Sequence, residues 1–150
     1  MPRNRPGALR ATVASCVPAS PPARVRGLSA AACLDVYRIE REAPSFVLYP
    51  GSTALALRRY RAFLHPFGGR PLYPRESMCP APRCAIDDVR HARDVLGEAL
   101  WFLPGRSRAA LAGLLRPLDA EYRRRTLPDA FADPTRPWWH RRLGEDGRSG

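Results

Sequence analysis

Apolar residues between positions 86 and 126 recur at the spacing of one helix face, on both sides of a clear turn signal. At about 100° per residue, the first run places its apolar side chains within roughly 60° of Leu96: Val89, Ala92, Ala99, Leu100 and Leu103, with Ile86 just outside. Pro104 and Gly105 end this run, because proline cannot continue the hydrogen-bond ladder and glycine tolerates left-handed geometry. A second run follows: Leu111, Leu114, Leu115, Leu118 and Tyr122. The pattern predicts an antiparallel helical hairpin over 86–103 and 107–126, whose apolar faces bury each other while the remaining segments cover the pair.

Local signals refine the hairpin. Asp87 and Asp88 suit the first turn of its first helix, where the positive end of the helix dipole favours acids. Ser107 is a good N-cap for the second helix. Pro117 predicts a kink or a restart within that helix.

Trp101 and Phe102 project away from the Leu96 face and therefore need a separate cover. We expect this cover to be a third helix near residues 53–64, which Ser52 or Thr53 caps. The alternative is an exposed patch that binds a partner.

The rest of the chain completes a mainly α fold with irregular ends. Ser29 predicts a cap for a helix through AAACLDVYRIERE. Residues 1–28 are rich in proline and arginine without an acid, which predicts a disordered basic arm. The domain then spans 29–126 and includes a Pro-rich loop over 65–84, and a turn-rich tail follows over 127–150.

Composition changes the picture in two ways. The net charge is +11, and all 25 basic residues are arginine, a bias that GC-rich coding produces without any selection for nucleic-acid binding. The resulting field is nevertheless real and attracts acidic partners. No run of 18 apolar residues is present, so we expect no membrane partner, and the four cysteines predict reduced thiols in a cytoplasmic protein.

The Pro-rich loop contains a possible metal site. Cys79 and Cys84 lie five positions apart, and His65 and His91 flank them, so the four side chains could hold a tetrahedral Zn²⁺. The spacing is not a standard tandem pair, and the alternative is free structural cysteines, with His91 paired to Asp87 one helical turn earlier. Zinc is therefore the only cofactor that the sequence suggests.

The tail contains an aromatic and basic cluster. Trp138 and Trp139 could stack on bases while Arg141 and Arg142 pair with phosphates. The arginines at the end of the preceding helix extend this cluster: Arg123, Arg124 and Arg125. The alternative, which we favour, is that the two tryptophans pack into the helical hairpin and fix the tail.

No phosphate-binding glycine loop, nucleophile elbow or HExxH motif is present, so we expect a protein that is not an enzyme. The favoured function is a basic binding protein that contacts an acidic partner such as DNA or RNA through the arginine and tryptophan cluster. The alternative is a structural or protein-interaction module that uses Trp101 or a loop stapled by zinc.

Two strings in the chain are distinctive: YRAFLHPFGGRPLYPRESMCPAPRCAIDD and LDAEYRRRTLPDAFADPTRPWWHRRL. Through them, residues 58–143 resemble small Arg-rich proteins of high-GC actinobacterial type. The resemblance implies a bacterial cytoplasmic setting and adds no site residue.

Overall fold

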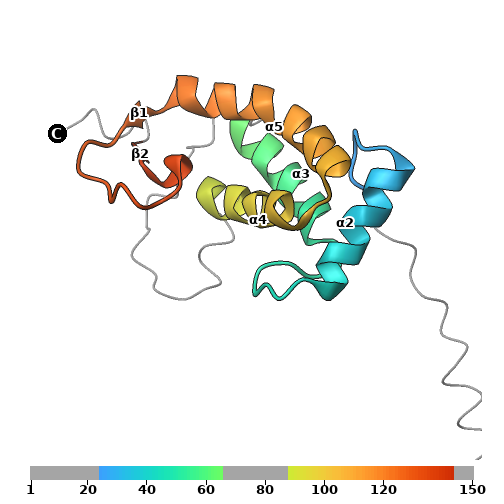
Figure 1. The fold of residues 1–150 in the computed structure, drawn as a ribbon. Coiled ribbons are helices and arrows are strands. Elements are labelled where there is room, and N and C mark those ends of the chain that lie inside the picture. Colours follow the sequence, from blue (N-terminus) through green and yellow to red (C-terminus); the bar gives the residue numbers. More distant parts are fainter. Residues whose placement is uncertain (1–23, 66–87, 144–150) are drawn as a thin grey trace, which may run out of the picture.

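Four α-helices form the framework of the described chain, which a computed structural model defines over residues 24–65 and 88–143 (Figure 1). They are α2 (Ala30–Glu42), α3 (Ser52–Leu64), α4 (Val89–Phe102) and α5 (Gly105–Arg125). A tail follows, with strand β1 (Leu127–Pro128), the short 3-10 helix η2 (Trp138–His140) and strand β2 (Arg142–Leu143). The predicted mainly helical fold, its hairpin and its third helix are confirmed.

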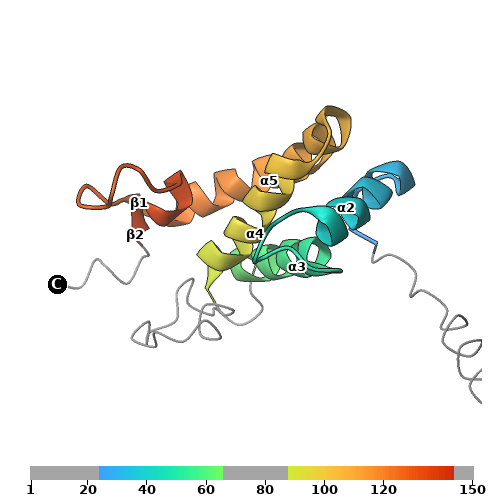
Figure 2. The same cartoon turned by 60° about the horizontal axis from the view of Figure 1, so that its bottom comes forward.

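Every pair of the four helices is in contact, but α3 and α4 pack along each other most extensively (Figures 1 and 2). The largest fully buried side chains come from both of these helices and from α5: Leu57, Tyr60, Leu96, Leu111, Leu115 and Tyr122. We expected the apolar faces of α4 and α5 to form the core while the other segments only cover this pair. This expectation is wrong for α3, which contributes its own fully buried side chains. Helix α3 is a full member of the core, because Leu57 and Tyr60 present an apolar face as complete as that of α5.

Helix α2 begins where the sequence predicts, and a buried carboxylate links it to α3. The predicted cap of α3 by Ser52 or Thr53 is wrong, because Gly51 is the N-cap residue and both predicted residues lie inside the helix. Ser29 caps α2 by accepting a hydrogen bond from the backbone N–H of Ala32 at 3.2 Å. Gly51 precedes α3 with a positive φ of 87°, which glycine adopts without strain. The Glu40 carboxylate then accepts hydrogen bonds from the N–H groups of Gly51 and Thr53, both at 2.8 Å. An acid on α2 thus satisfies the unpaired donors at the start of α3.

The starts of α4 and α5 differ from the prediction, since Asp88 precedes the first turn of α4 and α5 begins before Ser107. Asp88 caps α4 by accepting from the N–H of Arg90 at 2.8 Å. Helix α5 begins at Gly105, so Ser107 lies inside it, and its hydroxyl donates to Asp35 of α2 at 2.6 Å. The cap prediction for Ser107 is wrong because the helix starts two residues earlier, with Pro104 at the N-cap position. Helix α5 also continues through the exposed Pro117 without a restart.

The described fold starts earlier than the predicted domain boundary at residue 29. Val25 is buried in the core, and the N–H of Leu28 donates to its carbonyl in a turn. Gly27 has a φ of 100°, and a Cβ there would come within 2.9 Å of the Leu114 side chain. The prediction of a disordered arm is therefore wrong for residues 24–28. The rest of that arm, the loop over 66–84 and the tail beyond residue 143 lie outside the described residues.

Among the described residues, no helix covers Trp101. Helix α3 packs against α4, but Trp101 is 78% exposed, whereas Phe102 packs partly against the core. The prediction of an intramolecular cover is therefore wrong for Trp101, because α3 lies against the buried face of α4 and not beside this ring.

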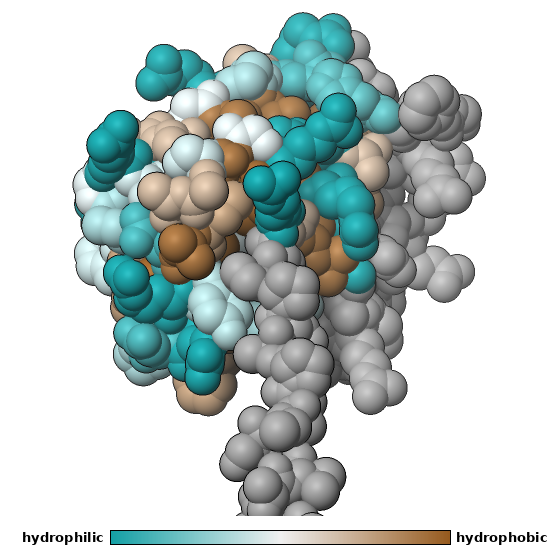
Figure 3. Space-filling view, turned by 90° about the vertical axis from the view of Figure 1, so that its right-hand side faces the viewer, coloured by the Kyte–Doolittle hydropathy of each residue, from teal (hydrophilic) through white to brown (hydrophobic). Residues whose placement is uncertain are grey.

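The surface is mixed in character. Figure 3 views the end of the molecule where α2 and α5 begin, and hydrophilic residues there surround smaller hydrophobic areas. Within the part of the chain that the structure describes, no helix has both the length and the apolar character needed to cross a bilayer.

Candidate acidic-partner interface at the C-terminal tail

The tail turns back along α4 and α5 and closes on itself. Strands β1 and β2 pair antiparallel, with Leu127 opposite Leu143, and the N–H of Asp129 donates to the carbonyl of Arg141 at 3.0 Å. Two aspartates shape the loop between the strands by accepting hydrogen bonds from residues two positions later. One of them, Asp133, accepts from both the hydroxyl and the N–H of Thr135, and these hydrogen bonds hold its pKa below the usual range.

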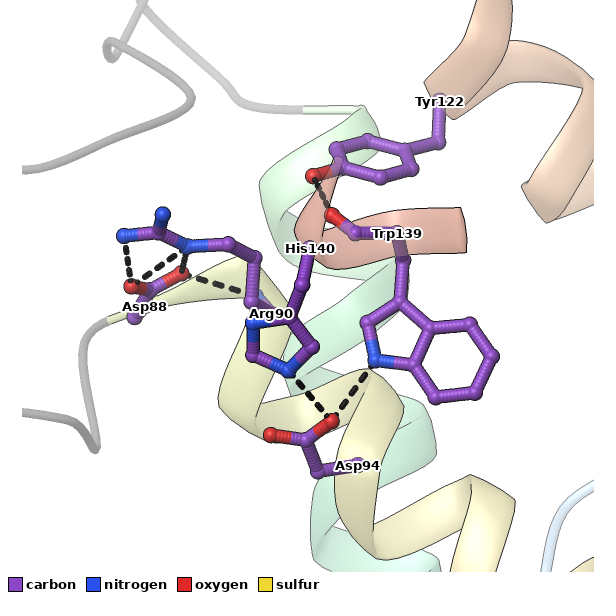
Figure 4. A network of polar contacts seen from close by, with 6 residues as sticks. All are labelled: Asp88, Arg90, Asp94, Tyr122, Trp139 and His140. Carbon is purple, nitrogen blue, oxygen red and sulfur yellow. Dashed lines mark hydrogen bonds and ion pairs between the residues drawn. The ribbon is translucent and has the colours of Figure 1, made fainter. Parts of the chain in front are cut away.

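Trp139 fixes the tail to α4 (Figure 4). Its Nε1–H donates to Asp94 Oδ1 at 2.7 Å, and the ring lies so close to Gly97 that a Cβ there would approach it to 3.3 Å. The Arg93 guanidinium lies over the indole at 4.2 Å from the ring centre. His140 Nε2 lies 2.7 Å from the same Asp94 oxygen. One carboxylate therefore holds two consecutive tail residues.

Trp138 is held by α5. Its ring lies 5.7 Å from that of Tyr122, and the Arg123 guanidinium stacks over it at 4.0 Å from the ring centre. The Tyr122 hydroxyl donates to the carbonyl of Trp139 at 2.9 Å. Both tryptophans thus pack against the hydrophobic core, in the arrangement that fixes the tail.

Two arginines of the cluster satisfy carbonyls at helix ends. Arg142 donates to the carbonyls of Arg123 and Thr126, at 2.8 and 2.7 Å, where α5 ends. Arg125 donates to the carbonyls of Phe63 and Leu64, at 2.9 and 3.0 Å, where α3 ends. Carbonyls at these positions have no partner within their own helix, and a cation there also suits the dipole.

Arg124 lies on the exposed side of α5, where it forms a salt bridge with Glu121 of 2.6 Å. The hydrogen bonds from Arg124 are the main cause that lowers the pKa of Glu121. Because the Arg124 side chain is 72% exposed to water, this pair adds little to stability.

Arginines from the end of α5 and from the tail surround a pocket of about 360 Å³. Arg123, Arg141 and Arg142 line it together with Trp138, and Asp129 is the one carboxylate among the lining residues. The Nε of Arg141 is buried and has no hydrogen-bond partner among the described residues. The pocket therefore has an excess of positive charge, with three arginines and one aspartate in its lining.

Of the predicted contact residues, the structure brings Arg123, Trp138, Arg141 and Arg142 together around this pocket. Trp139 lies beneath it against α4, and Arg124 and Arg125 point to other partners. Trp101 does not line the pocket. The predicted cluster therefore does not form one surface. Four of its residues line the pocket, Trp139 fixes the tail, and Arg124 and Arg125 pair with groups elsewhere.

A network of polar side chains lies behind the tail, and the sequence pattern does not indicate it. Arg93 forms a two-pronged salt bridge with Asp119, at 2.9 and 3.1 Å, and the Tyr60 hydroxyl donates to the same carboxylate at 2.7 Å. Burial, and then the negative charge of Asp119, raise the pKa of Tyr60 far above its usual value. Arg93 joins α4, α5 and the Trp139 ring, so the tail rests on a fixed support.

One sequence signal could have located the contact of the tail. Gly97 lies in the middle of α4, where glycine costs about 1 kcal/mol relative to alanine, so its presence indicates a close approach. The approaching group is the Trp139 indole. Nothing in the sequence distinguishes Asp94 from other surface acids, because its partners come from residues 139 and 140.

The predicted metal ligands are not joined by the described structure. His65 is exposed at the end of α3, and His91 lies in the first turns of α4. Cys79, Cys84 and Asp87 lie outside the described residues. Within residues 24–65 and 88–143, no three His, Cys, Asp or Glu side chains are grouped so that they could hold a metal ion.

No protein-family model matches the chain, and neither a curated protein nor a solved structure matches it.

Proposed function

We propose that the protein is a binding protein without enzymatic activity, whose arginine-rich surface contacts an acidic partner, with DNA or RNA as the preferred class. The observation that supports this proposal is the tail pocket, in which three arginines face one carboxylate around a hollow of about 360 Å³. A net charge of +11 adds a long-range attraction toward polyanions.

The arrangement favours contacts to phosphate over stacking on bases. Guanidinium groups already lie over the rings of Trp138 and Trp139, at 4.0 and 4.2 Å, so each indole has one face occupied. A guanidinium that stacks on a ring, as Arg123 does on Trp138, keeps N–H donors in its own plane for the oxygens of a phosphate. We therefore expect binding with little sequence preference.

Fluorescence anisotropy with a labelled single strand tests the proposal. Three phosphate contacts predict a slope of about −2 for log K against log salt, because each contact releases condensed counterions. The double variant Arg123→Ala/Arg141→Ala should flatten that slope by about one to two units. A control, Arg106→Ala/Arg116→Ala, removes the same charge from exposed positions of α5 and should keep most of the slope. A flat salt response of the natural protein would contradict the proposal.

A second candidate function rests on Trp101, which is 78% exposed at the end of α4. An exposed tryptophan is a typical anchor of a protein interface, so the chain would act as a structural or protein-interaction module. The complex or self-association should then survive high salt and be lost in Trp101→Ala. Phe131→Ala is the matched control, since Phe131 is 99% exposed on the tail loop. An unchanged complex in Trp101→Ala would exclude this function.

The proposal that zinc holds the Pro-rich loop through Cys79, Cys84, His65 and His91 accompanies the second candidate. Native mass spectrometry of the purified protein measures metal content and oligomeric state in one experiment. One zinc per chain that is lost in Cys79→Ser would support the proposal, and a mass equal to that of the bare chain would contradict it.

A further inference from the structure

A second basic pocket lies between the turn at residues 24–28 and the exposed side of α3. Its volume is about 580 Å³, which falls in the range of small-molecule sites. Four arginines line it, Arg24 and Arg26 from the turn and Arg58 and Arg61 from α3. None of them belongs to the cluster that the sequence analysis selected.

The charge of this pocket is not balanced locally. Its lining contains no aspartate or glutamate. Glu40 lies behind Gly51, but its carboxylate is buried and accepts the hydrogen bonds that cap α3. Within the described chain, none of the four arginines forms a salt bridge. Four cations that share one hollow repel one another, and an anion placed among them would relieve this repulsion.

Part of the pocket is held in place. Arg61 donates to the carbonyl of Arg26 through both terminal nitrogens, at 3.4 and 3.5 Å, so the turn and α3 are tied across the pocket. Val25 anchors the same turn in the core. The two segments that carry the arginines are therefore joined without a ligand, which lowers the cost of binding.

The walls between the arginines are apolar. Leu55, Leu57 and Ala54 contribute aliphatic groups, and Tyr49 adds a phenol ring that is half exposed. A bare inorganic anion would leave these groups without a contact, whereas an organic anion with a flat body would cover them.

We propose that this pocket binds a small phosphorylated compound with an aromatic body, of the chemical class of a nucleoside diphosphate. The guanidinium groups take the phosphates through paired N–H donors, and Tyr49 with the aliphatic wall takes the ring. The site is separate from the tail pocket and does not depend on binding of a polyanion there.

Isothermal titration calorimetry of the full chain with ADP tests the proposal, with adenosine and pyrophosphate as part-ligands. We expect one ADP per chain, and at least tenfold weaker binding of either part-ligand. Pyrophosphate that binds as tightly as ADP would overturn the assignment, since the apolar wall would then contribute nothing. Adenosine that binds as tightly as ADP, or an absence of ADP binding, would overturn it equally.

Variants separate the pocket from the general charge of the protein. Arg24→Ser/Arg58→Ser should weaken ADP binding at least tenfold, while Arg106→Ser/Arg116→Ser removes the same charge elsewhere and should leave it within twofold. Tyr49→Ala should weaken ADP but not pyrophosphate, and it supplies a second test if the double variant folds poorly. An equal loss in the control pair would overturn the proposal. The tail variant Arg123→Ala/Arg141→Ala should keep ADP binding, so failure of polyanion binding at the tail is distinguishable from failure of this site.

Discussion

Arginines surround both basic pockets, but those of the tail are committed to the fold and those beside α3 are not. Around the tail pocket, Arg142 donates to the carbonyls that end α5, and Arg123 stacks on Trp138. In the pocket at α3, neither Arg24 nor Arg58 pairs with a carboxylate or stacks on an aromatic ring within the described residues. The charge available to a ligand is therefore greater in the pocket whose arginines are dispersed in the sequence.

The comparison also shows how this fold uses its arginines, several of which donate to carbonyls at helix ends. Three helices end at carbonyls that an arginine from another segment or turn satisfies: Arg108 at the end of α4, Arg125 at α3 and Arg142 at α5. Arginine suits this task because its planar group can donate to two carbonyls at once. A cluster of arginines in the sequence thus indicates capping as readily as it indicates a binding surface.

The largest expected effect is the loss of Arg93, which supports the tail from inside. Arg93→Ala leaves the partly buried Asp119 carboxylate with only the Tyr60 hydroxyl and removes the cation over Trp139. We expect a loss of about 3 kcal/mol in the free energy of unfolding, because a partly buried charge is left without its cation. Urea denaturation measures it. The control Arg124→Ala breaks the exposed pair with Glu121 and should cost no more than about 0.5 kcal/mol. Equal losses in the two variants would show that Arg93 is not buried as the structure has it.

The next effect concerns the tail directly. Arg142→Ala removes donors from two carbonyls and from the Thr126 hydroxyl, and we expect a loss of about 2 kcal/mol. Hydrogen exchange should show faster exchange in the last turn of α5 and in the tail, with α2 unchanged. Arg58→Ala, at an exposed position of α3, is the matched comparison and should change neither the free energy of unfolding nor the exchange at the end of α5. Unchanged exchange at the end of α5 would contradict the capping role of Arg142.

The elements of this fold were predictable because each depends on neighbouring residues. The repeat around Leu96 places α4, Ser29 starts α2, and Pro104 separates α4 from α5. The relative importance of helix pairs was not predictable in this way. Tyr60 and Leu96 meet in the core from segments separated by a long loop, and nothing local indicates that α3 outranks α5 as a partner of α4.

The candidate site was predictable in composition but not in arrangement. Arg123, Trp138, Arg141 and Arg142 do line one pocket, as their closeness in the sequence suggested. The partners that fix their roles are distant: Asp94 holds Trp139 across 45 positions. The pocket beside α3 was missed for the same reason, since its arginines come from two segments, one of them within the predicted disordered arm.

A pH titration sharpens the contrast between the buried network and the exposed pockets. Burial and Asp119 raise the pKa of Tyr60 above its usual value of 10.0, so the folded protein keeps the phenol neutral after the unfolded chain has ionised it. Stability should therefore be complete below pH 10 and fall as the pH rises further, by up to about 1.4 kcal/mol per unit from this group. Tyr60→Phe removes this contribution, and the difference between the two pH profiles isolates it from the other tyrosines. Parallel profiles above pH 10 would contradict the raised pKa.

The smallest expected effect on the free energy of unfolding comes from arginines that form no salt bridge in the described fold. Arg24→Ser/Arg58→Ser removes two of the four cations beside α3 without breaking a salt bridge in the described chain. We expect the free energy of unfolding to change by no more than about 0.5 kcal/mol, and to rise at low salt because repulsion is relieved. Urea denaturation at low and high ionic strength measures both quantities. A loss of about 1 kcal/mol or more at both salt concentrations would mean that these arginines are also structural, and the contrast between the two pockets would then disappear.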